Sequence, residues 1–196
     1  MINVGIIGAN GYLGLELIRI LKAHPHIKIK SIFKRDALIE DEFKHLMNTS
    51  LNETLSSDIS DFQNLDCVFL SLPHGQSYDY VKQLLGKVKI IDLSSDSRIS
   101  NKLLYSQYYN HDMDENIQKK FTYGFIEKNS EDIKSAHNIA NPGCFALCTQ
   151  LALLPFSEVI TSASINAITG SSGGGKEPTI KNHHSTRSKD MFSYGI

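Results

Sequence analysis

The chain opens with Asn3-Val4-Gly5-Ile6-Ile7-Gly8-Ala9-Asn10-Gly11-Tyr12-Leu13-Gly14, and this stretch decides the fold class. Its first part is a short apolar run, which is typical of a parallel strand buried on both faces. Glycines follow, and helical periodicity over Leu15–Leu21 predicts a helix that ends near His24-Pro25. A strand, a glycine turn and a helix in this order begin an α/β dinucleotide-binding unit of the Rossmann type.

The glycine turn has the spacing G-x-x-G-x-x-G, whereas the more common form is G-x-G-x-x-G. In such turns the first glycine allows a tight bend, the second lets the backbone approach a pyrophosphate, and the third permits close packing of helix on strand. The helix N-terminus then holds the phosphate charge. A plain strand-to-helix turn is the alternative, but its place in the chain favours cofactor binding by Gly8, Asn10, Gly11, Tyr12 and Leu13.

The second strand is predicted over Ile27–Phe33, and Lys34-Arg35-Asp36 follows it. An NAD-binding unit places an acidic residue here, where it binds the 2′-hydroxyl of the ribose. Two cations instead suit the 2′-phosphate of NADP, because a guanidinium grips phosphate in a bidentate fork. The sequence therefore favours NADP, with Lys34 and Arg35 as ligands, and a solvated loop pair is the alternative.

Two further strands are predicted over Asp66–Pro73 and Val88–Leu93, with a helix over Gln76–Leu85 between them. A polar cluster comes directly after each strand, and ligands gather at the carboxyl ends of strands in open α/β sheets. His74 and Gly75, after the first of these strands, are therefore expected to line the cofactor crevice.

The second cluster is Ser94-Ser95-Asp96-Ser97-Arg98, and it ends in a cation that is always charged. An anionic ligand is the natural partner of Arg98, and a salt bridge to Asp96 is the alternative. Cys67 lies inside a predicted strand, which favours a buried structural thiol.

The turn Asn141-Pro142-Gly143-Cys144 delivers a cysteine to the start of an apolar helix predicted over Cys144–Leu154. A short strand, Ala136–Ala140, leads into it. Unpaired N–H groups and the macrodipole at a helix N-terminus favour an anion, so a thiol there ionises readily and becomes a nucleophile. A buried structural cysteine is the alternative, because free cysteines are among the most buried residues.

Three other segments have weaker patterns. The polar stretch Ala37–Asp61 is expected to hold a short helix and a variable loop, and Tyr105–Lys119 is expected to be irregular. After Tyr123–Glu127, a polar helix is predicted as far as Ser135.

The end of the chain begins a different pattern. Alternation over Ser162–Thr169 predicts a half-exposed strand. We therefore place a domain boundary near Asn141, between a dinucleotide-binding domain (1–141) and the start of an α+β catalytic and dimerisation domain (142–196).

The loop Gly170-Ser171-Ser172-Gly173-Gly174-Gly175-Lys176 is flexible and suits an anion. It does not match the Walker A pattern, because Lys176 is followed by Glu177 rather than by serine or threonine. A metal site at His183-His184 is not expected, since no carboxylate or thiol has matching spacing.

The composition excludes several classes of function. A net charge of -1 without a basic stripe argues against nucleic-acid binding, and no apolar run is long enough for a membrane helix. The chain enters a strand directly after Met1, so we expect no signal peptide. Three cysteines without a disulfide pattern suit the reducing cytoplasm.

Taken together, these motifs resemble the N-acetyl-γ-glutamyl-phosphate reductase family, which is grouped with aspartate-semialdehyde dehydrogenase. Two of them depart from the family pattern, which usually has Asp-Phe-Arg at Asp96-Ser97-Arg98 and Leu-Pro-Glu at Phe125-Ile126-Glu127; both keep the charged residue. The motifs occur in the family's order: Gly8–Gly14, Leu72-Pro73-His74-Gly75, Asp92–Arg98, Tyr123–Glu127, Asn141–Cys144 and Gly170–Lys176.

The resemblance implies an enzyme of arginine biosynthesis that reduces an acyl phosphate to an aldehyde. Cys144 matches the cysteine that attacks the acyl phosphate, expels phosphate and forms a thioester, which hydride from NADPH then reduces. Arg98, Asn141 and Lys176 are the expected substrate-binding residues. Beside the residues of the glycine turn and of Lys34-Arg35, the expected cofactor-binding residues are Pro73, Gly75, Ser172 and Gly173.

Members of the family are considerably longer, and their catalytic histidine is expected a few residues beyond Ile196. We therefore expect a C-terminally truncated chain that binds NADP weakly and turns over poorly, and a homo-oligomer at full length. Two alternatives remain. One is a reductase of another acyl phosphate, such as an aspartyl or aminoadipyl phosphate; the other is an NADP-binding fragment in which Cys144 is idle.

Overall fold

The computed structural model describes residues 1–33, 54–109, 114–176, 179–180, 182–188 and 191. By compactness the chain divides into two units, Met1–Thr161 and Ser162–Ile196, and each is described by itself. This division reflects chain packing, so the domain boundary near Asn141 stays a prediction. No helix in the described parts of the chain is both long and apolar enough to cross a lipid bilayer.

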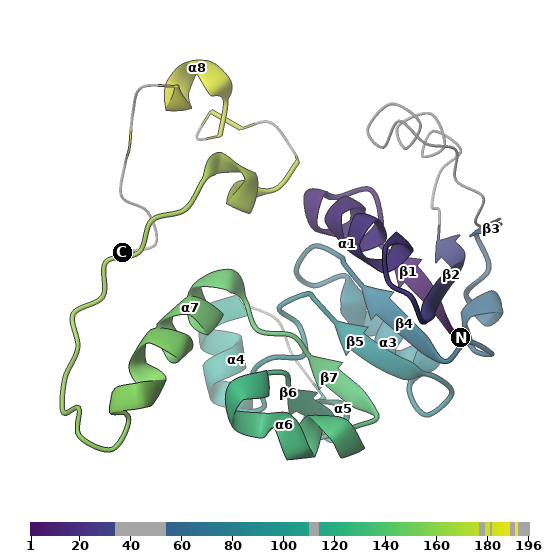
Figure 1. Cartoon of the computed structure of the whole chain (residues 1–196), viewed down its shortest axis with the longest axis horizontal. Coiled ribbons are helices and arrows are strands. Elements are labelled where there is room, and N and C mark those ends of the chain that lie inside the picture. Colours follow the sequence, from purple (N-terminus) through teal and green to yellow (C-terminus); the bar gives the residue numbers. More distant parts are fainter. Residues whose placement is uncertain (34–53, 110–113, 177–178, 181, 189–190, 192–196) are drawn as a thin grey trace. The chain divides into compact units, whose positions relative to one another are not determined.

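The first unit is built on a seven-stranded parallel sheet with the strand order β3-β2-β1-β4-β5-β7-β6 (Figure 1). The order runs outward from β1 to β2 and β3 and from β4 to β5, and β7 then lies between β5 and the edge strand β6. Winding in both directions from a central pair is the pattern of a doubly wound sheet. The predicted α/β Rossmann-type fold is therefore confirmed. The strands are β1 (Ile2–Ile7), β2 (Ile27–Phe33), β3 (Thr54–Ser56), β4 (Cys67–Leu70), β5 (Lys89–Asp92), β6 (Phe121–Tyr123) and β7 (Asn138–Ala140).

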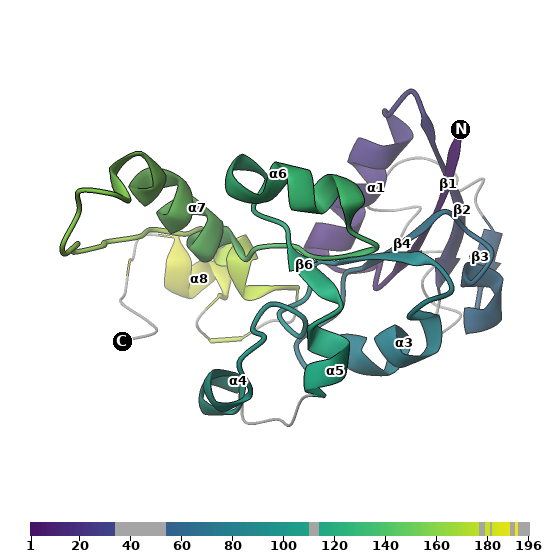
Figure 2. The same cartoon turned by 90° about the horizontal axis from the view of Figure 1, so that it is seen from below.

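Helices cover both faces of this sheet, with α1 and α6 on one face and α3 and α5 on the other (Figure 2). Connections that alternate between strand and helix place them there. The helices of the first unit are α1 (Tyr12–Lys22), α3 (Ser77–Leu84), α4 (Lys102–Tyr109), α5 (Glu115–Gln118), α6 (Ile126–Ser135) and α7 (Cys144–Leu153), with 3₁₀ turns η1 (Ile59–Phe62) and η2 (Leu154–Phe156).

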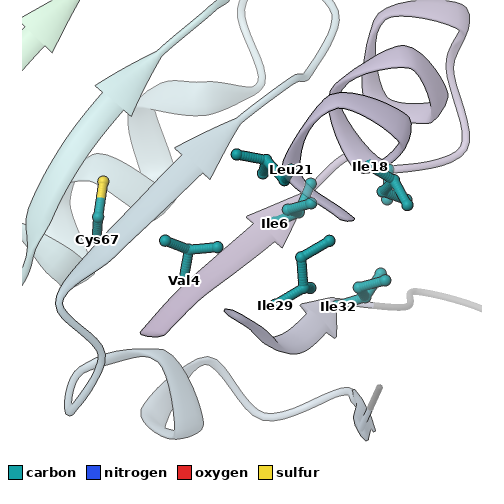
Figure 3. Close-up of a cluster of buried hydrophobic side chains, with 8 residues drawn as sticks. Val4, Ile6, Ile18, Leu21, Ile29, Ile32 and Cys67 are labelled. Atoms are coloured by element: carbon teal, nitrogen blue, oxygen red, sulfur yellow. The ribbon is translucent and has the colours of Figure 1, made fainter. Parts of the chain in front are cut away.

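Alternate residues of β1 supply the core on each face of the sheet. Val4 and Ile6 pack under α1, whose buried residues include Ile18 and Leu21 (Figure 3). Ile7 instead belongs to a second cluster on the α3 side, formed by side chains of β4, α3 and η1. A strand buried on both faces needs apolar side chains in both directions, which explains the continuous apolar run.

The strands end in one row at the carboxyl edge of the sheet. Ile7 pairs with Leu70, Leu70 with Asp92, and Asp92 with Ala140. The ladder continues one step into the loops, because the N–H groups of the residues after Leu70 and Ala140 donate to Ile7 and Asp92 at 2.8 Å. The loops that carry the predicted site residues therefore begin side by side.

Two sequence-based expectations were wrong. Tyr105–Lys119 is not irregular throughout, because α4 and α5 form there; the side chains of Asn101 and Asp114 accept backbone N–H groups at their starts. Ser162–Thr169 forms no strand, since none of the described residues pairs with it. Alternating polarity predicts a strand only where a neighbouring strand can complete its hydrogen bonds.

Other expectations were close to the structure. β2 spans the predicted residues, and α7 begins at the predicted Cys144 and ends at Leu153, where η2 accommodates Pro155 in its first turn. Within Ala37–Asp61, the described part holds β3 and most of η1. The rest of that stretch lies outside the described residues.

The turn after β1 brings Gly8 against the end of β4. Its backbone has φ +85°, and a Cβ atom at this position would lie only 2.2 Å from the carbonyl oxygen of Ser71. Both the left-handed backbone and the lack of space therefore require glycine.

Replacing Gly8 with alanine should destabilise the fold more than replacing Gly86, which serves as the matched control. Both glycines have positive φ, and this backbone costs alanine about 1–2 kcal/mol. Only Gly8 has the close contact, whereas a Cβ at Gly86 meets nothing within 4 Å. Urea unfolding should give Gly8→Ala an extra loss of roughly 1–3 kcal/mol. Equal losses for the two variants would contradict the close approach of Gly8 to Ser71.

Candidate functional site

The glycine turn between β1 and α1 fits a phosphate-bearing dinucleotide. A Cβ at Gly14 would lie 2.6 Å from the Gly8 carbonyl oxygen, so α1 packs tightly on the turn, whereas a Cβ at Gly11 would meet nothing within 4 Å. Gly11 caps α1 without a side-chain hydrogen bond, and the first turn of the helix contains no acidic residue. Backbone N–H groups at this end are thus available to an anion.

A cavity of about 640 Å³ lies at the carboxyl ends of β2 and β3. Its lining includes Phe33, Asp58, Gly75, Asp79 and Tyr80, which come from three different segments of the chain. In doubly wound sheets, ligands bind outside the carboxyl ends of the strands, which is the edge where this cavity lies. Lys34 and Arg35, the predicted ligands of the 2′-phosphate, lie outside the described residues.

The turn after β4 is held by a buried carboxylate from the next strand's loop. Asp96 is 2% exposed, and its oxygens accept the N–H groups of Gly75 at 2.8 Å and Ser77 at 3.0 Å. Nδ1 of His74 lies 2.6 Å from Asp96 and 2.7 Å from the hydroxyl of Ser95. The predicted position of His74 beside this turn therefore has a specific anchor.

Asp92, the last residue of β5, is fully buried beside Asp96. Its carboxylate accepts the hydroxyl of Ser97 at 2.6 Å and the N–H of Ser94 at 2.9 Å. The hydroxyl of Ser77 stands between both carboxylates, 2.9 Å from Asp96 and 3.3 Å from Asp92. Burial raises the pKa of Asp92, and the hydrogen bonds from Ser97 and Ser94 oppose that rise.

Arg98 ties the loop after β5 to the turn before α7. Its Nε donates to the carbonyl oxygen of Asn141 at 2.7 Å, and its Nη2 donates to that of Leu93 at 2.8 Å. A Cβ on Gly143 would lie 2.7 Å from Nη1, so glycine lets the guanidinium reach the start of α7. Backbone carbonyls, rather than the alternative partner Asp96, therefore hold Arg98.

Cys144 is the first residue of α7 and is exposed. Gly143 caps the helix and supplies no side-chain hydrogen bond to its first turn. Cys148, one turn later, is also exposed, whereas Cys67 is buried, as predicted from its strand. Burial raises the pKa of the Cys67 thiol to about 12, so this cysteine stays protonated.

The second unit contains three of the predicted site residues. Ser172 and Gly173 lie in η3 (Ser171–Gly174), and Lys176 follows it. The short helix α8 (His184–Arg187) is capped by His183, whose ring accepts the N–H of Ser185. Among the residues that the structure describes, no three His, Cys, Asp or Glu side chains gather to hold a metal ion.

The structure thus brings the glycine turn, Gly75, Arg98, Asn141 and Cys144 to one edge of one sheet. Sequence reasoning missed the parts played by Asp92, Asp96 and Ser77. The only signal for them was the polar cluster directly after β5, where an aspartate can reach the neighbouring loop.

Replacing Asp92 with asparagine should change how stability depends on pH. Because the folded-state pKa of Asp92 is raised, the wild type loses relative stability as pH rises from the unfolded value of about 3.9 through the higher folded value. The variant cannot titrate there, so its free energy of unfolding should improve relative to wild type across that window. Urea titrations at a series of pH values measure this difference; one that stays constant or shrinks with rising pH would contradict it.

Two family models match the chain, and together they span nearly all of it. The semialdehyde dehydrogenase NAD-binding domain matches residues 3–136, and the semialdehyde dehydrogenase dimerisation domain matches residues 144–196. Aspartate semialdehyde dehydrogenase from Candida albicans, determined with NADP, has a TM-score of 0.55 at 15% identity and covers 81% of this chain and 47% of its own. The enzyme of that name from Francisella tularensis has a TM-score of 0.53 at 16% identity, and the match covers 80% of this chain and 42% of that enzyme's chain.

Curated relatives are more similar in sequence. N-acetyl-gamma-glutamyl-phosphate reductase from Campylobacter curvus is 38% identical, and the match covers 98% of this chain and 59% of the relative's length. The reductase of the same name from Ehrlichia canis is 37% identical, and the match covers 89% of this chain and 53% of the relative's length. A Pyrococcus furiosus protein, named as a putative LysW-L-2-aminoadipate/LysW-L-glutamate phosphate reductase, is 36% identical. That match covers 99% of this chain and 58% of the relative's length. The chain thus spans little more than half the length of these relatives. The resemblance seen in the motifs is confirmed, and the chain belongs to the semialdehyde dehydrogenase family.

Proposed function

We propose that the protein acts as an NADPH-dependent reductase of N-acetyl-γ-glutamyl phosphate in arginine biosynthesis, yielding N-acetylglutamate semialdehyde. One observation carries the proposal: an exposed cysteine begins a helix at the sheet edge that also bears the glycine turn. The names of relatives that are 37% and 38% identical support this choice of substrate.

In the proposed reaction the Cys144 thiolate attacks the acyl carbon of the substrate. The carbon–sulfur bond forms as the bond to the phosphate oxygen breaks, so phosphate leaves and an enzyme thioester remains. N–H groups at the start of α7 would stabilise the oxyanion, because the first N–H groups of a helix have no partner within the helix. When bound beside the thioester, NADPH would supply the hydride for its reduction. The resulting thiohemiacetal collapses to the aldehyde and restores the thiolate.

Arg98, Asn141 and Lys176 are proposed to bind the substrate. Arg98 is already fixed by two backbone carbonyls, so its guanidinium offers an ordered cationic donor at the start of α7. An ordered guanidinium suits the phosphate or carboxylate of the substrate. By resemblance, the general acid–base for the proton transfers would be a histidine, and none of the described histidines is assigned this role.

NADP rather than NAD is the proposed cofactor. Gly8, Asn10, Gly11, Tyr12 and Leu13 would hold the pyrophosphate, because the open face at Gly11 and the uncapped N-terminus of α1 suit its charge. Lys34 and Arg35 would bind the 2′-phosphate. Pro73, Gly75, Ser172 and Gly173 are the other proposed cofactor-binding residues.

The proposal also covers the oligomeric state and the cellular compartment of the protein. The match to a dimerisation domain supports a homo-oligomer, and three cysteines without a disulfide suit the cytoplasm. Neither nucleic acid nor a membrane is a proposed partner.

A second acyl phosphate also fits the same chemistry. The 36% identity to the P. furiosus protein favours an aminoadipyl derivative as the runner-up, ahead of an aspartyl phosphate. Comparing the rates of phosphate release from the three acyl phosphates would choose between them. The third possibility, a cofactor-binding fragment with an idle cysteine, predicts release from none.

Replacing Cys144 with serine should abolish acyl transfer, with Cys148→Ser as the matched control on the same helix. With N-acetyl-γ-glutamyl phosphate and no NADPH, wild type and Cys148→Ser should release one equivalent of phosphate and gain the acyl mass. Cys144→Ser should be slower by on the order of a thousandfold or more, because the nucleophile is lost. Phosphate release and intact-protein mass spectrometry measure both effects. A Cys144→Ser variant that keeps the wild-type rate would remove the thioester mechanism.

Iodoacetamide near neutral pH should label Cys144 selectively, and the acyl-phosphate substrate should protect it. Cys67 serves as the internal control, because its buried thiol stays protonated and should react only after unfolding. Peptide mapping by mass spectrometry measures each site. Labelling of Cys144 that is no faster than that of an ordinary thiol, and unaffected by substrate, would favour the idle-cysteine alternative.

A further inference from the structure

We propose that Asp96 is a positioning residue for the cofactor: its buried carboxylate holds the turn Pro73–Ser77 in the conformation that receives the dinucleotide. The inference rests on the proposed binding of NADP and adds a residue that contacts neither substrate nor cofactor. Its basis is the set of hydrogen bonds that join the loop after β5 to the turn after β4.

Each oxygen of the Asp96 carboxylate serves one side of that turn. Oδ1 accepts the N–H of Gly75 at 2.8 Å and lies 2.6 Å from Nδ1 of His74. Oδ2 accepts both the N–H of Ser77 at 3.0 Å and its hydroxyl at 2.9 Å. Three consecutive features of the turn, the His74 ring, the Gly75 amide and the start of α3, thus share one anchor.

The anchor itself is rigid. Asp96 is 2% exposed, its N–H donates to the hydroxyl of Ser94 at 3.1 Å, and the side-chain amide of Gln118 donates to its carbonyl oxygen. Its neighbour Asp92 is fixed by serine hydroxyls in the same buried network. A carboxylate without rotational freedom fixes the positions of the groups that bond to it.

The hydrogen-bond donors of this turn require an acceptor at both oxygens, which only a carboxylate provides. Two backbone N–H groups and the Ser77 hydroxyl are divided between two oxygens, with the His74 ring against one of them. An ionised carboxylate accepts at both oxygens, whereas an amide of the same shape accepts at one and presents a donor at the other. Asparagine at this position therefore sets an NH₂ against a backbone N–H in either orientation.

The turn that Asp96 holds forms part of the candidate cofactor site. Gly75 lines the cavity at the carboxyl edge together with Phe33 and Tyr80. The centroid of the His74 ring lies 4.2 Å from that of Tyr109, so the two rings pack against each other. A turn that moves would change the wall of the cavity, and a preorganised wall binds its ligand with less loss of conformational entropy.

The test compares Asp96→Asn with Asp66→Asn. Asp66 also accepts a backbone N–H, that of Asn3 at 2.7 Å, but it is exposed and precedes β4 at the opposite edge of the sheet. The dissociation constant for NADPH, from its fluorescence, and the free energy of unfolding are measured for wild type and both variants. Amide hydrogen exchange at Gly75 and Ser77 reports the order of the turn.

We expect Asp96→Asn to raise the dissociation constant for NADPH about tenfold or more, the size of a lost hydrogen bond to a charged group. Exchange at Gly75 and Ser77 should accelerate in this variant alone. Asp66→Asn should bind NADPH like the wild type, even where it loses stability. A merely structural role for Asp96 instead predicts equal affinities, and that result would overturn the inference.

Two further outcomes are decisive. If Asp96→Asn does not fold, Ser77→Ala takes its place: about threefold weaker binding supports the inference, since one donor to Asp96 is lost, and unchanged binding overturns it. If the wild type does not bind NADPH, both the proposed cofactor and the positioning role of Asp96 are contradicted. If Asp96→Asn binds NADPH more weakly but the wild type shows no acyl transfer, the proposed reaction is contradicted and the positioning role of Asp96 is still supported.

Discussion

The last hydrogen bonds of the parallel ladder are the interaction on which the rest of the structure depends. The N–H groups of Ser71, Leu93 and Asn141 donate at 2.8 Å to Ile7, Leu70 and Asp92, each on the neighbouring strand. Because parallel strands are spaced by about 4.8 Å, this register makes four loops emerge as close neighbours. Residues that are far apart in sequence, such as the glycine turn and Cys144, thereby share one edge.

This arrangement places buried charge beside the proposed site. Asp92 and Asp96 are almost completely buried, and burial raises the pKa of Asp92. Hydrogen bonds from serines and backbone N–H groups satisfy both carboxylates, so the network can be kept in the interior. We infer that this network mainly holds the loops in one conformation, since a buried polar network fixes geometry more than it adds stability. Arg98 extends the same order to α7 through Asn141.

Much of the fold could be predicted because its signals are local. The apolar runs around Ile6 and Val68 specify buried parallel strands, and the Asn-Pro-Gly turn specifies where α7 begins. The contacts of Asp96 could not be predicted, since its partners lie 19 and 21 residues away and become neighbours only through strand register. The strand expected over Ser162–Thr169 was wrong for a related reason, because a strand depends on a partner that its own sequence does not encode.

The proposed function requires the carboxyl edge of the sheet to bind the dinucleotide next to the helix that begins with Cys144. Titration of the ¹⁵N-labelled chain with NADPH, followed by backbone amide chemical shifts, tests it most directly. The amides of Gly11, Tyr12, Gly75 and Cys144 should shift, while those of Asn3 and Val88, at the opposite edge, should not. Shifts confined to the opposite edge, or their absence at saturating NADPH, would contradict it.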